Sequence, residues 1–169
     1  MYRIRYASVE DAAVLGKIHS ASWKKAYKNI IPDDILNNIT PEKRTLDFKK
    51  ALSKGFEEDA LIFNEDHLPL GLICFGKSRD KDLDSSHGEI WGIYLLPEYW
   101  NQGVGSKLIH WGISELRRRN YKKAVLWVLE DNIIGRRFYE KNGFIFDGTS
   151  KEIIIGKPLI ELRYIKNID

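Results

Sequence analysis

The sequence predicts an α/β domain in which a mixed sheet carries helices on its faces. Two observations lead to this class. Short apolar runs rich in Val, Ile, Leu and aromatic residues alternate with longer segments whose apolar residues recur at spacings of three and four. Only a few residues separate the runs 59–65 and 69–78, so these two runs are expected to pair as antiparallel strands.

The N-terminal half of the chain begins with a strand, several helices and this strand pair. Ser8 is followed three residues later by Asp11, a pattern that caps the start of a helix. Thr40 with Pro41 at the first helical position marks another helix start. In chain order we expect a strand at 2–8, helices at 8–27, 32–36 and 40–52, and strands at 59–65 and 69–78.

The C-terminal half continues the pattern after a polar connection. Pro97 ends the next apolar strand because proline cannot donate a hydrogen bond to a sheet, and Gly143 ends the last helix. No repeat or linker divides the chain, so residues 1–169 are expected to form a single domain. In chain order we expect a strand at 88–97, a helix at 104–116, a strand at 122–130, a helix at 132–143, and strands at 144–153 and 158–168.

The composition is that of a globular protein rather than a secreted or membrane protein. The chain has 169 residues, of which 43% are hydrophobic and 30% are charged. No apolar run approaches the roughly 18 residues that a membrane-spanning helix needs, and the N-terminus does not resemble a signal peptide. A single cysteine, Cys74, excludes an internal disulfide and is expected to be buried in a strand. We therefore expect a cytoplasmic protein without a membrane partner.

The charge balance is mildly basic, with a net charge of +3, so a nucleic-acid partner has to be weighed. The dense basic cluster, RRRNYKK at 117–123, falls where a helix should end, and the helix dipole favours cations there whatever the function. A small anionic ligand suits this charge better than a nucleic acid. The four histidines show no metal-ligand spacing, so no metal site is expected.

Two glycines, Gly103 and Gly105, stand where a strand turns into a helix. Such a turn presents several unpaired backbone N–H groups with the positive end of the helix dipole behind them, which suits a phosphate. Close packing of a helix against a strand would also require glycine, and both explanations stay open. A nucleotide-binding P-loop is excluded because Ser106 separates Gly105 from Lys107, and the dinucleotide fingerprint lacks its third glycine.

Residues 88–148 resemble the GNAT superfamily of N-acetyltransferases, which transfer acetyl groups from acetyl-CoA to amines. The family carries Arg/Gln-x-x-Gly-x-Gly/Ala at its pyrophosphate turn, where this chain has the residues from Trp100 to Gly105. A later family motif, Asn-x-x-Ala-x-x-Phe-Tyr-x-x-x-Gly-Phe, is matched by Asn132, Gly135, Phe138, Tyr139, Gly143 and Phe144. Trp100 in place of Arg or Gln and Gly135 in place of Ala depart from the pattern.

The resemblance implies a GNAT-type, mostly antiparallel sheet with helices on both faces, splayed between the strands around 89–96 and 122–129. It also implies that acetyl-CoA is the acetyl donor. With Trp100 in the first position, Gln102 or a nearby basic side chain is expected to assist the backbone in binding phosphate. The cofactor-binding residues carried over are Ile93, Tyr94, Leu95, Trp100, Asn101, Gln102, Gly103, Val104, Gly105, Ser106, Asn132, Phe138 and Tyr139.

Two residues are predicted to be catalytic. Tyr139 matches the family's tyrosine, and a phenol with a pKa of about 10 can protonate a departing thiolate whose conjugate acid has a pKa of about 8.5. The alternative for Tyr139 is packing at a helix end. Glu89 stands where some family members carry a catalytic glutamate and would accept the amine proton, directly or through water. The alternative for Glu89 is an exposed residue at a strand start.

The amine acceptor cannot be named from the sequence. The resemblance places the acceptor cleft beside the first helices, so Trp23, Tyr27 and His19 are candidates to contact it. The leading prediction is an acetyl-CoA-dependent N-acetyltransferase acting on a primary amine of a small molecule or peptide. The alternative is a non-catalytic acyl-CoA-binding sensor or partner module of the same fold. A homodimer stays open at this stage.

Overall fold

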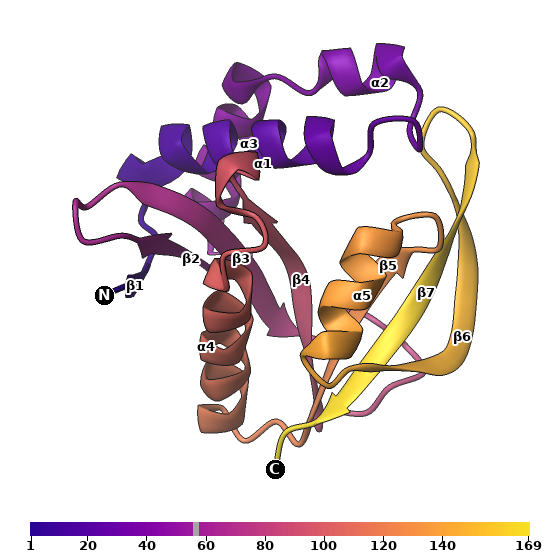
Figure 1. Ribbon diagram of the computed structural model, residues 1–169. Coiled ribbons are helices and arrows are strands. Elements are labelled where there is room, and N and C mark those ends of the chain that lie inside the picture. The colour runs from indigo at the N-terminus through magenta and orange to yellow at the C-terminus, as the bar shows by residue number, and fades with distance from the viewer. Residues whose placement is uncertain (56–57) are drawn as a thin grey trace.

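The computed structural model describes residues 1–55 and 58–169, and its centre is a seven-stranded sheet in the order β1-β2-β3-β4-β5-β7-β6 (Figure 1). The strands are β1 Arg3–Tyr6, β2 Glu58–Phe63, β3 Pro69–Lys77, β4 His87–Leu95, β5 Lys123–Leu129, β6 Ile145–Ile154 and β7 Pro158–Asn167. The helices are α1 Ala12–Ala26, α2 Asp33–Asn38, α3 Pro41–Lys54, α4 Val104–Arg118 and α5 Ile133–Lys141, with 3-10 turns at Val9–Asp11 and Pro97–Tyr99. Every predicted strand and helix is present, and the turn at Pro97–Tyr99 is an addition.

The sheet is mixed because one of its neighbouring pairs is parallel. β4 and β5 pair in parallel, whereas the other pairs are antiparallel. The parallel pairing covers only His87–Glu89 against Lys123–Val125, although both strands continue beyond it. The splay implied by the family resemblance is therefore confirmed.

A bulge accompanies the splay. On β4, Trp91 has no counterpart on β3, because Cys74 pairs with Gly92 and Phe75 pairs with Ile90. A bulge bends its strand and increases the local twist, which turns the end of β4 away from β5. The bulge lies directly beside Gly92, so β4 contains both a bulge and a splay.

Helices cover both faces of the sheet (Figure 1). On one face, the buried apolar stripe of α4 joins residues of β3, β4, β5 and β7 in the largest hydrophobic cluster. On the other face, α1 and α3 bury Leu15, Ile18 and Phe48 against Leu61 and Leu72. Because this face has its own apolar cluster, side chains on α1 and α3 are held firmly over the middle of the sheet.

α1 and α3 approach each other closely at Gly16. A Cβ atom at that position would lie 2.6 Å from Thr45 Oγ1 on α3, so only glycine permits this spacing. The predicted cap of α3 is present, since the Lys43 N–H donates to Thr40 Oγ1 at 3.3 Å. The two helices therefore lie side by side over the sheet.

The basic cluster at the end of α4 is engaged inside the molecule. Arg117 donates to the Ile168 carbonyl, Arg118 pairs with Glu115, and Arg119 pairs with Glu58. These contacts support the interpretation of the cluster as a helix end rather than a nucleic-acid surface.

Other expectations from composition can be compared with the described residues. Cys74 is buried in β3, as predicted. Over the ranges 1–55 and 58–169, no helix combines the length and apolar character needed to cross a membrane. Within the same ranges, no three His, Cys, Asp or Glu side chains are grouped so as to hold a metal ion.

Candidate active site

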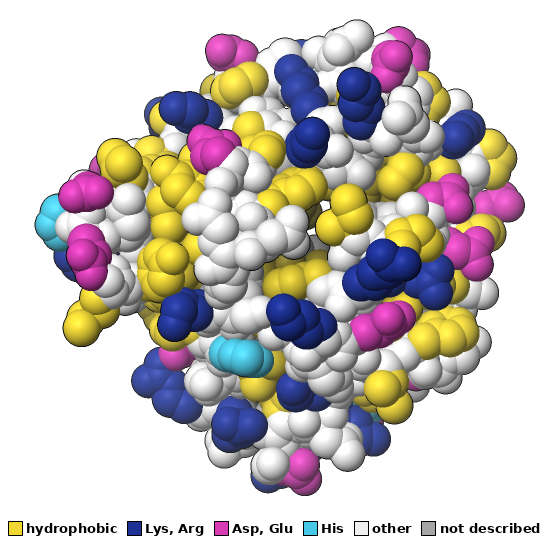
Figure 2. Space-filling model, in the orientation of Figure 1, with side chains coloured by type: hydrophobic (Ala, Val, Ile, Leu, Met, Phe, Trp, Pro, Cys, Tyr) yellow, Lys and Arg dark blue, Asp and Glu magenta, His cyan; other side chains and the backbone are white. Residues whose placement is uncertain are grey.

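The gap between β4 and β5 exposes a strand edge inside the molecule. Beyond Glu89, β4 keeps its partner β3 on one side but has none toward β5. In an antiparallel pair, alternate backbone N–H groups point away from the partner, so those of Ile90–Leu95 that do so face the gap. Figure 2 shows a hollow in the middle of this face, in the orientation in which Figure 1 places β4 beside α5.

The turn that follows β4 leaves backbone donors free at the start of α4. Gly103 is the N-cap residue of α4, has a φ of 79°, and makes no side-chain cap. Nothing lies within 4 Å of the position where a Cβ atom would be, so the space in front of the first-turn N–H groups is open. These donors, with the positive end of the α4 dipole, suit a phosphate group.

Gly105 serves close packing of the helix against its neighbours, which is the second explanation that the sequence left open. A Cβ atom on this buried residue would lie 3.0 Å from Phe138 Cε2 and 3.2 Å from Leu95 Cδ1. Gly105 therefore lets α4 approach β4 and α5 closely, whereas Gly103 serves the turn itself. Each of the two explanations applies to one glycine.

The side chains around the turn stabilise its shape. Trp100 Nε1 donates to the Leu95 carbonyl at 3.1 Å, and Gln102 Nε2 donates to the Glu98 carbonyl at 2.6 Å. Asn101 has a φ of 60°. The expected assistance of Gln102 to a phosphate finds no support in this arrangement, because its amide is bound to the 3-10 turn.

The remaining predicted cofactor residues border the same gap. Ile93, Leu95 and Phe138 pack against the edge of the large hydrophobic cluster, and Val104 lies within it. Ser106 follows Gly105 in the first turn of α4. Asn132 caps α5, since its Oδ1 accepts the Gly135 N–H at 3.0 Å, so its amide oxygen is already bound.

Tyr139 reaches the gap from α5, and Tyr27 reaches it from the end of α1 on the opposite face. Burial, and then the neighbouring Tyr27, raise the pKa of Tyr139 well above its usual value. Burial, and then Tyr27, also raise the pKa of Tyr94 on β4. Tyr27, which follows α1, therefore lies near enough to affect both Tyr94 and Tyr139. At neutral pH each hydroxyl keeps its proton and can donate a hydrogen bond.

Glu89 lies at the point where β4 and β5 separate, and it is buried, with 1% of its surface exposed. The alternative of an exposed residue at a strand start is therefore wrong. Its Oε1 accepts from Arg79 Nη2 at 2.5 Å and Nε at 3.2 Å, and its Oε2 accepts the Arg79 N–H at 2.8 Å. This charge-assisted pairing fixes the carboxylate at the closed end of the gap.

A second carboxylate, Glu161 on β7, faces the same region and was not predicted. It pairs with Leu129, whose side chain belongs to the cluster of Tyr27 and Trp23, so Glu161 shares the α1 face of the sheet. Burial raises its pKa, and Glu89 raises it further, while Lys151 opposes the shift. An isolated acidic residue in the otherwise apolar start of β7 is the only local signal that the sequence offered.

The connection between β3 and β4 is anchored over this face. Arg163, which is buried, donates to Asp80 at 3.3 Å, Asp82 at 2.9 Å and Asp147 at 2.7 Å. Trp127 Nε1 donates to the same Asp80 at 2.9 Å. These contacts hold the segment that carries Arg79, and thereby hold Arg79 against Glu89.

Candidate acceptor residues line the α1 side of the gap. His19 stacks on Trp23 with ring centroids 5.6 Å apart and lies 4.5 Å from the ring of Tyr94. Trp23 in turn meets Tyr27 edge to face at 4.7 Å. The three predicted residues therefore form a continuous aromatic wall beside Tyr94.

Together these features suit transfer of an acyl group between an anionic carrier and a second substrate. The turn before α4 can hold phosphate, the open edge of β4 can bind amide and carbonyl groups, and Tyr139 can donate a proton within the gap. The aromatic wall lies across the gap from α5, so a second substrate can approach from the opposite face of the sheet.

The comparisons with known proteins agree with this geometry. A model of the acetyltransferase (GNAT) family matches residues 23–144. An uncharacterized N-acetyltransferase of Bacillus subtilis, YuaI, is 31% identical over 170 residues, covering 94% of both chains. A spermidine N(1)-acetyltransferase of Thermoplasma acidophilum is 28% identical over 152 residues, covering 86% of this chain and 89% of the relative.

Solved structures show the same fold. The crystal structure of the PaiA N-acetyltransferase of Thermoplasma acidophilum in complex with coenzyme A has a TM-score of 0.74 at 23% identity over 99% of both chains. YncA of Salmonella typhimurium, solved with acetyl-CoA, has a TM-score of 0.72 at 20% identity, covering 99% of this chain and 94% of that one. The match of the family model across most of the chain confirms the predicted resemblance, and the protein belongs to the acetyltransferase (GNAT) family.

Proposed function

We propose that the protein transfers the acetyl group of acetyl-CoA to a primary amine of a small molecule or peptide by direct attack on the thioester. The observation that carries the proposal is the open edge of β4, which runs straight into the phosphate-binding turn and lies opposite Tyr139. An acetyl donor with an anionic end and a reactive thioester end fits a site in which the turn, the β4 edge and Tyr139 follow one another in space.

The residues that would hold the donor follow from the geometry. The N–H groups from Gly103 to Ser106 bind its diphosphate, and the β4 edge from Ile93 to Leu95 binds its amide-containing arm and the thioester oxygen. Phe138 and Leu95 supply apolar contact along the gap. No charged side chain is required at the turn, because the backbone provides the donors.

Acetyl transfer then requires the acceptor nitrogen to lose protons and the departing sulfur to gain one. The acceptor must lose a proton, because a primary alkyl amine with a pKa of about 10.4 is mostly protonated at neutral pH. Glu89 accepts this proton through water at the closed end of the gap. The free amine attacks the carbonyl carbon, a nitrogen–carbon bond forms, and the carbon–sulfur bond breaks as Tyr139 donates its proton to the departing thiolate. The nitrogen then releases its second proton, which restores the phenol of Tyr139 through water.

An acyl-CoA sensor would need the phosphate turn but not this chemistry. A half-buried, protonated phenol placed in the gap is useful for protonating sulfur, and binding alone does not require it. Tyr139 therefore favours the enzyme over the sensor.

The proposal is tested by measuring thiol release from acetyl-CoA over a panel of amines. Polyamines belong in the panel because a relative is named a spermidine N(1)-acetyltransferase, and amino acids, aminoglycosides and peptide N-termini complete it. We expect at least one class to release coenzyme A well above the rate of hydrolysis, with an acetylated product detectable by mass. Binding of acetyl-CoA without transfer to any amine would instead identify a sensor.

A further inference from the structure

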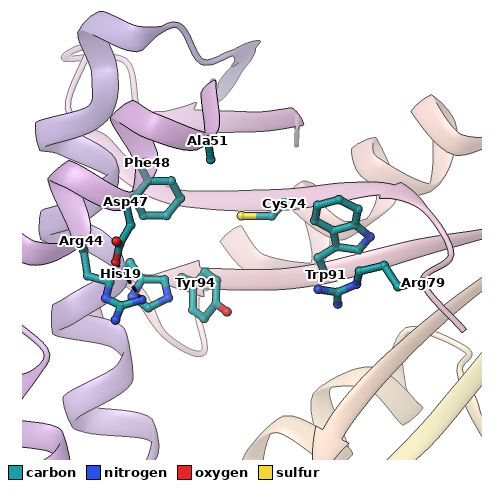
Figure 3. A pocket seen from close by; sticks show the side chains of 9 residues that line it. All are labelled: His19, Arg44, Asp47, Phe48, Ala51, Cys74, Arg79, Trp91 and Tyr94. Atoms are coloured by element: carbon teal, nitrogen blue, oxygen red, sulfur yellow. Dashed lines mark ion pairs between the residues drawn. The ribbon is translucent and has the colours of Figure 1, made fainter. Parts of the chain in front are cut away.

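A cavity of about 310 Å³ opens between α1, α3 and the strands β3 and β4 (Figure 3). Phe48 and Ala51 of α3 form one wall, and Trp91 and Tyr94 of β4 form the opposite one. A guanidinium lies at each end, Arg44 beside His19 and Arg79 beside Trp91, as Figure 3 shows. The cavity is thus an apolar slot with two polar ends.

The slot adjoins the reaction centre. Tyr94 forms part of its wall and lies near enough to Tyr139 for Tyr139 to contribute to the raised pKa of Tyr94. α5, which carries Tyr139, lies on the opposite face of the sheet. A molecule in the slot can therefore extend a reactive group past Tyr94 into the gap while the rest of it stays on the α1 face.

The Arg44 end contains polar atoms without partners. Among the described residues, His19 Nδ1 and Arg44 Nε are buried and make no hydrogen bond. Leaving such an atom unpaired costs about 1–3 kcal/mol, so a folded protein rarely keeps two of them together without a reason. Both belong to residues that line the same cavity.

The charges in the slot make its Arg44 end attractive to an anion. Arg79 is already paired with Glu89 through both Nε and Nη2. Arg44 has a weaker partner, since its Nη1 lies 3.4 Å from Asp47, whose side chain is 63% exposed. His19 is neutral, because burial and then the charge of Arg44 lower its pKa to about 3. Within residues 1–55 and 58–169, the carboxylate that pairs with Arg44 is therefore an exposed one, which balances its positive charge only weakly.

We propose that this slot selects an acceptor that carries a carboxylate as well as the primary amine, and that Arg44 binds the carboxylate. The proposal rests on the acetyltransferase function proposed above. A planar guanidinium suits a carboxylate through two parallel hydrogen bonds from its N–H groups. A polyamine would instead bring a second ammonium group toward Arg44.

The test compares amines that differ only by the carboxylate. L-lysine is paired with cadaverine, L-ornithine with putrescine, and L-phenylalanine with phenethylamine. Thiol release from acetyl-CoA gives kcat/KM, and calorimetry with desulfo-coenzyme A present gives acceptor affinity without turnover. We expect the carboxylate-bearing member of at least one pair to be favoured by about 10- to 100-fold, the range of a charged hydrogen bond of 1.5–3 kcal/mol.

Three variants assign the preference to Arg44. Arg44→Gln should bring the ratio of kcat/KM for the carboxylate-bearing amine to kcat/KM for its partner close to one. Lys50→Gln, which removes an exposed charge from the same helix, should leave this ratio unchanged. Asp47→Asn should keep the ratio or raise it, because the competing carboxylate is removed. Melting temperatures of all three show whether the fold is intact.

The outcomes separate this proposal from the function on which it rests. If no carboxylate-bearing amine exceeds its partner in affinity or in turnover, the proposal is overturned, even where acetyl transfer to another amine occurs. A preference for the diamines that Asp47→Asn abolishes would overturn it as well and would assign the slot to a cation. Failure of every amine to react, with a carboxylate preference in calorimetry, would overturn the catalytic function alone.

Discussion

The donor side of the gap consists mainly of backbone groups, whereas the acceptor side consists mainly of side chains. The donor side consists of the β4 edge, the turn at Gly103 and the start of α4, which follow one another along the chain and act mainly through backbone N–H groups. The acceptor side consists of side chains from α1, α3, β4 and β7, which lie far apart in the sequence. One side depends on chain conformation, and the other depends on residue identity.

This difference explains how one fold can keep its acetyl donor while changing its acceptor. Backbone donors persist under most side-chain substitutions, provided that the glycines which shape the turn remain. A slot lined by side chains changes its charge with a single substitution. We therefore expect substitutions on the donor side to affect binding of acetyl-CoA with any acceptor, and substitutions on the acceptor side to affect the choice of amine.

The largest effect is expected at Tyr139, where the two sides meet. Tyr139→Phe keeps the ring and its contacts with Phe138 and Phe144 and removes only the hydroxyl. Loss of a general acid should lower kcat by roughly 10²- to 10⁴-fold, while acetyl-CoA affinity measured by calorimetry stays within a few-fold. If the variant turns over like the parent at saturating donor, water or another group protonates the sulfur.

The next largest effect tests whether the backbone N–H groups at the Gly103 turn bind acetyl-CoA. Acetyl-CoA at about 100 times its Kd should stabilise the parent by about 2.7 kcal/mol in thermal melts. Gly103→Val should abolish this gain, because its side chain covers the first-turn N–H groups. Gly148→Val is the matched control, since Gly148 also has a positive φ, 90°, and open space around it, but lies on β6. Equal ligand stabilisation in both variants would contradict a phosphate site at this turn.

A smaller effect is expected when the proposed base is removed. Glu89→Gln should lower kcat/KM about tenfold or more near pH 7 and much less near pH 10, where the amine is already neutral. Glu161→Gln is the control, because Glu161 lies on the same face and has no assigned proton transfer. If the pH-dependent loss follows Glu161 instead, the base is the carboxylate on β7. A loss that is uniform over pH would leave Glu89 with a positioning role through Arg79.

The smallest effect concerns the buried histidine of the acceptor side. His19 has a pKa of about 3 in the fold against 6.5 when unfolded, so below pH 6.5 the unfolded chain binds a proton that the folded chain does not. Stability should fall as the pH falls below this value, by about 1.4 kcal/mol for each pH unit from this group. His19→Phe should lessen the slope measured by denaturant unfolding, and His110→Phe, at an exposed position, should not. Equal slopes in the two variants would show that His19 is protonated in the fold.

Much of the donor side could be predicted from the sequence, because its signals are local. The helix cap at Asn132 acts over three residues and is present, as is the cap at Thr40 on the acceptor side. The glycine pair marked the turn, but the separate tasks of Gly103 and Gly105 required the positions of Phe138 and Leu95. The burial of Glu89 and its pairing with Arg79 were also missed, since no local pattern connects a strand residue with a loop arginine ten positions earlier.

The sequence by itself determined the strands and helices, the caps, the glycine turn before α4 and the family, since periodicity and short motifs are properties of neighbouring residues. Tertiary structure alone decided that Tyr27 lies near enough to Tyr139 to raise its pKa, that Glu161 faces the same region, and that Arg44 and His19 share one cavity. These contacts depend on the close approach of α1 and α3 and on the divergence of β4 from β5. Such long-range packing is selected by the burial of the whole core, so no stretch of sequence records it.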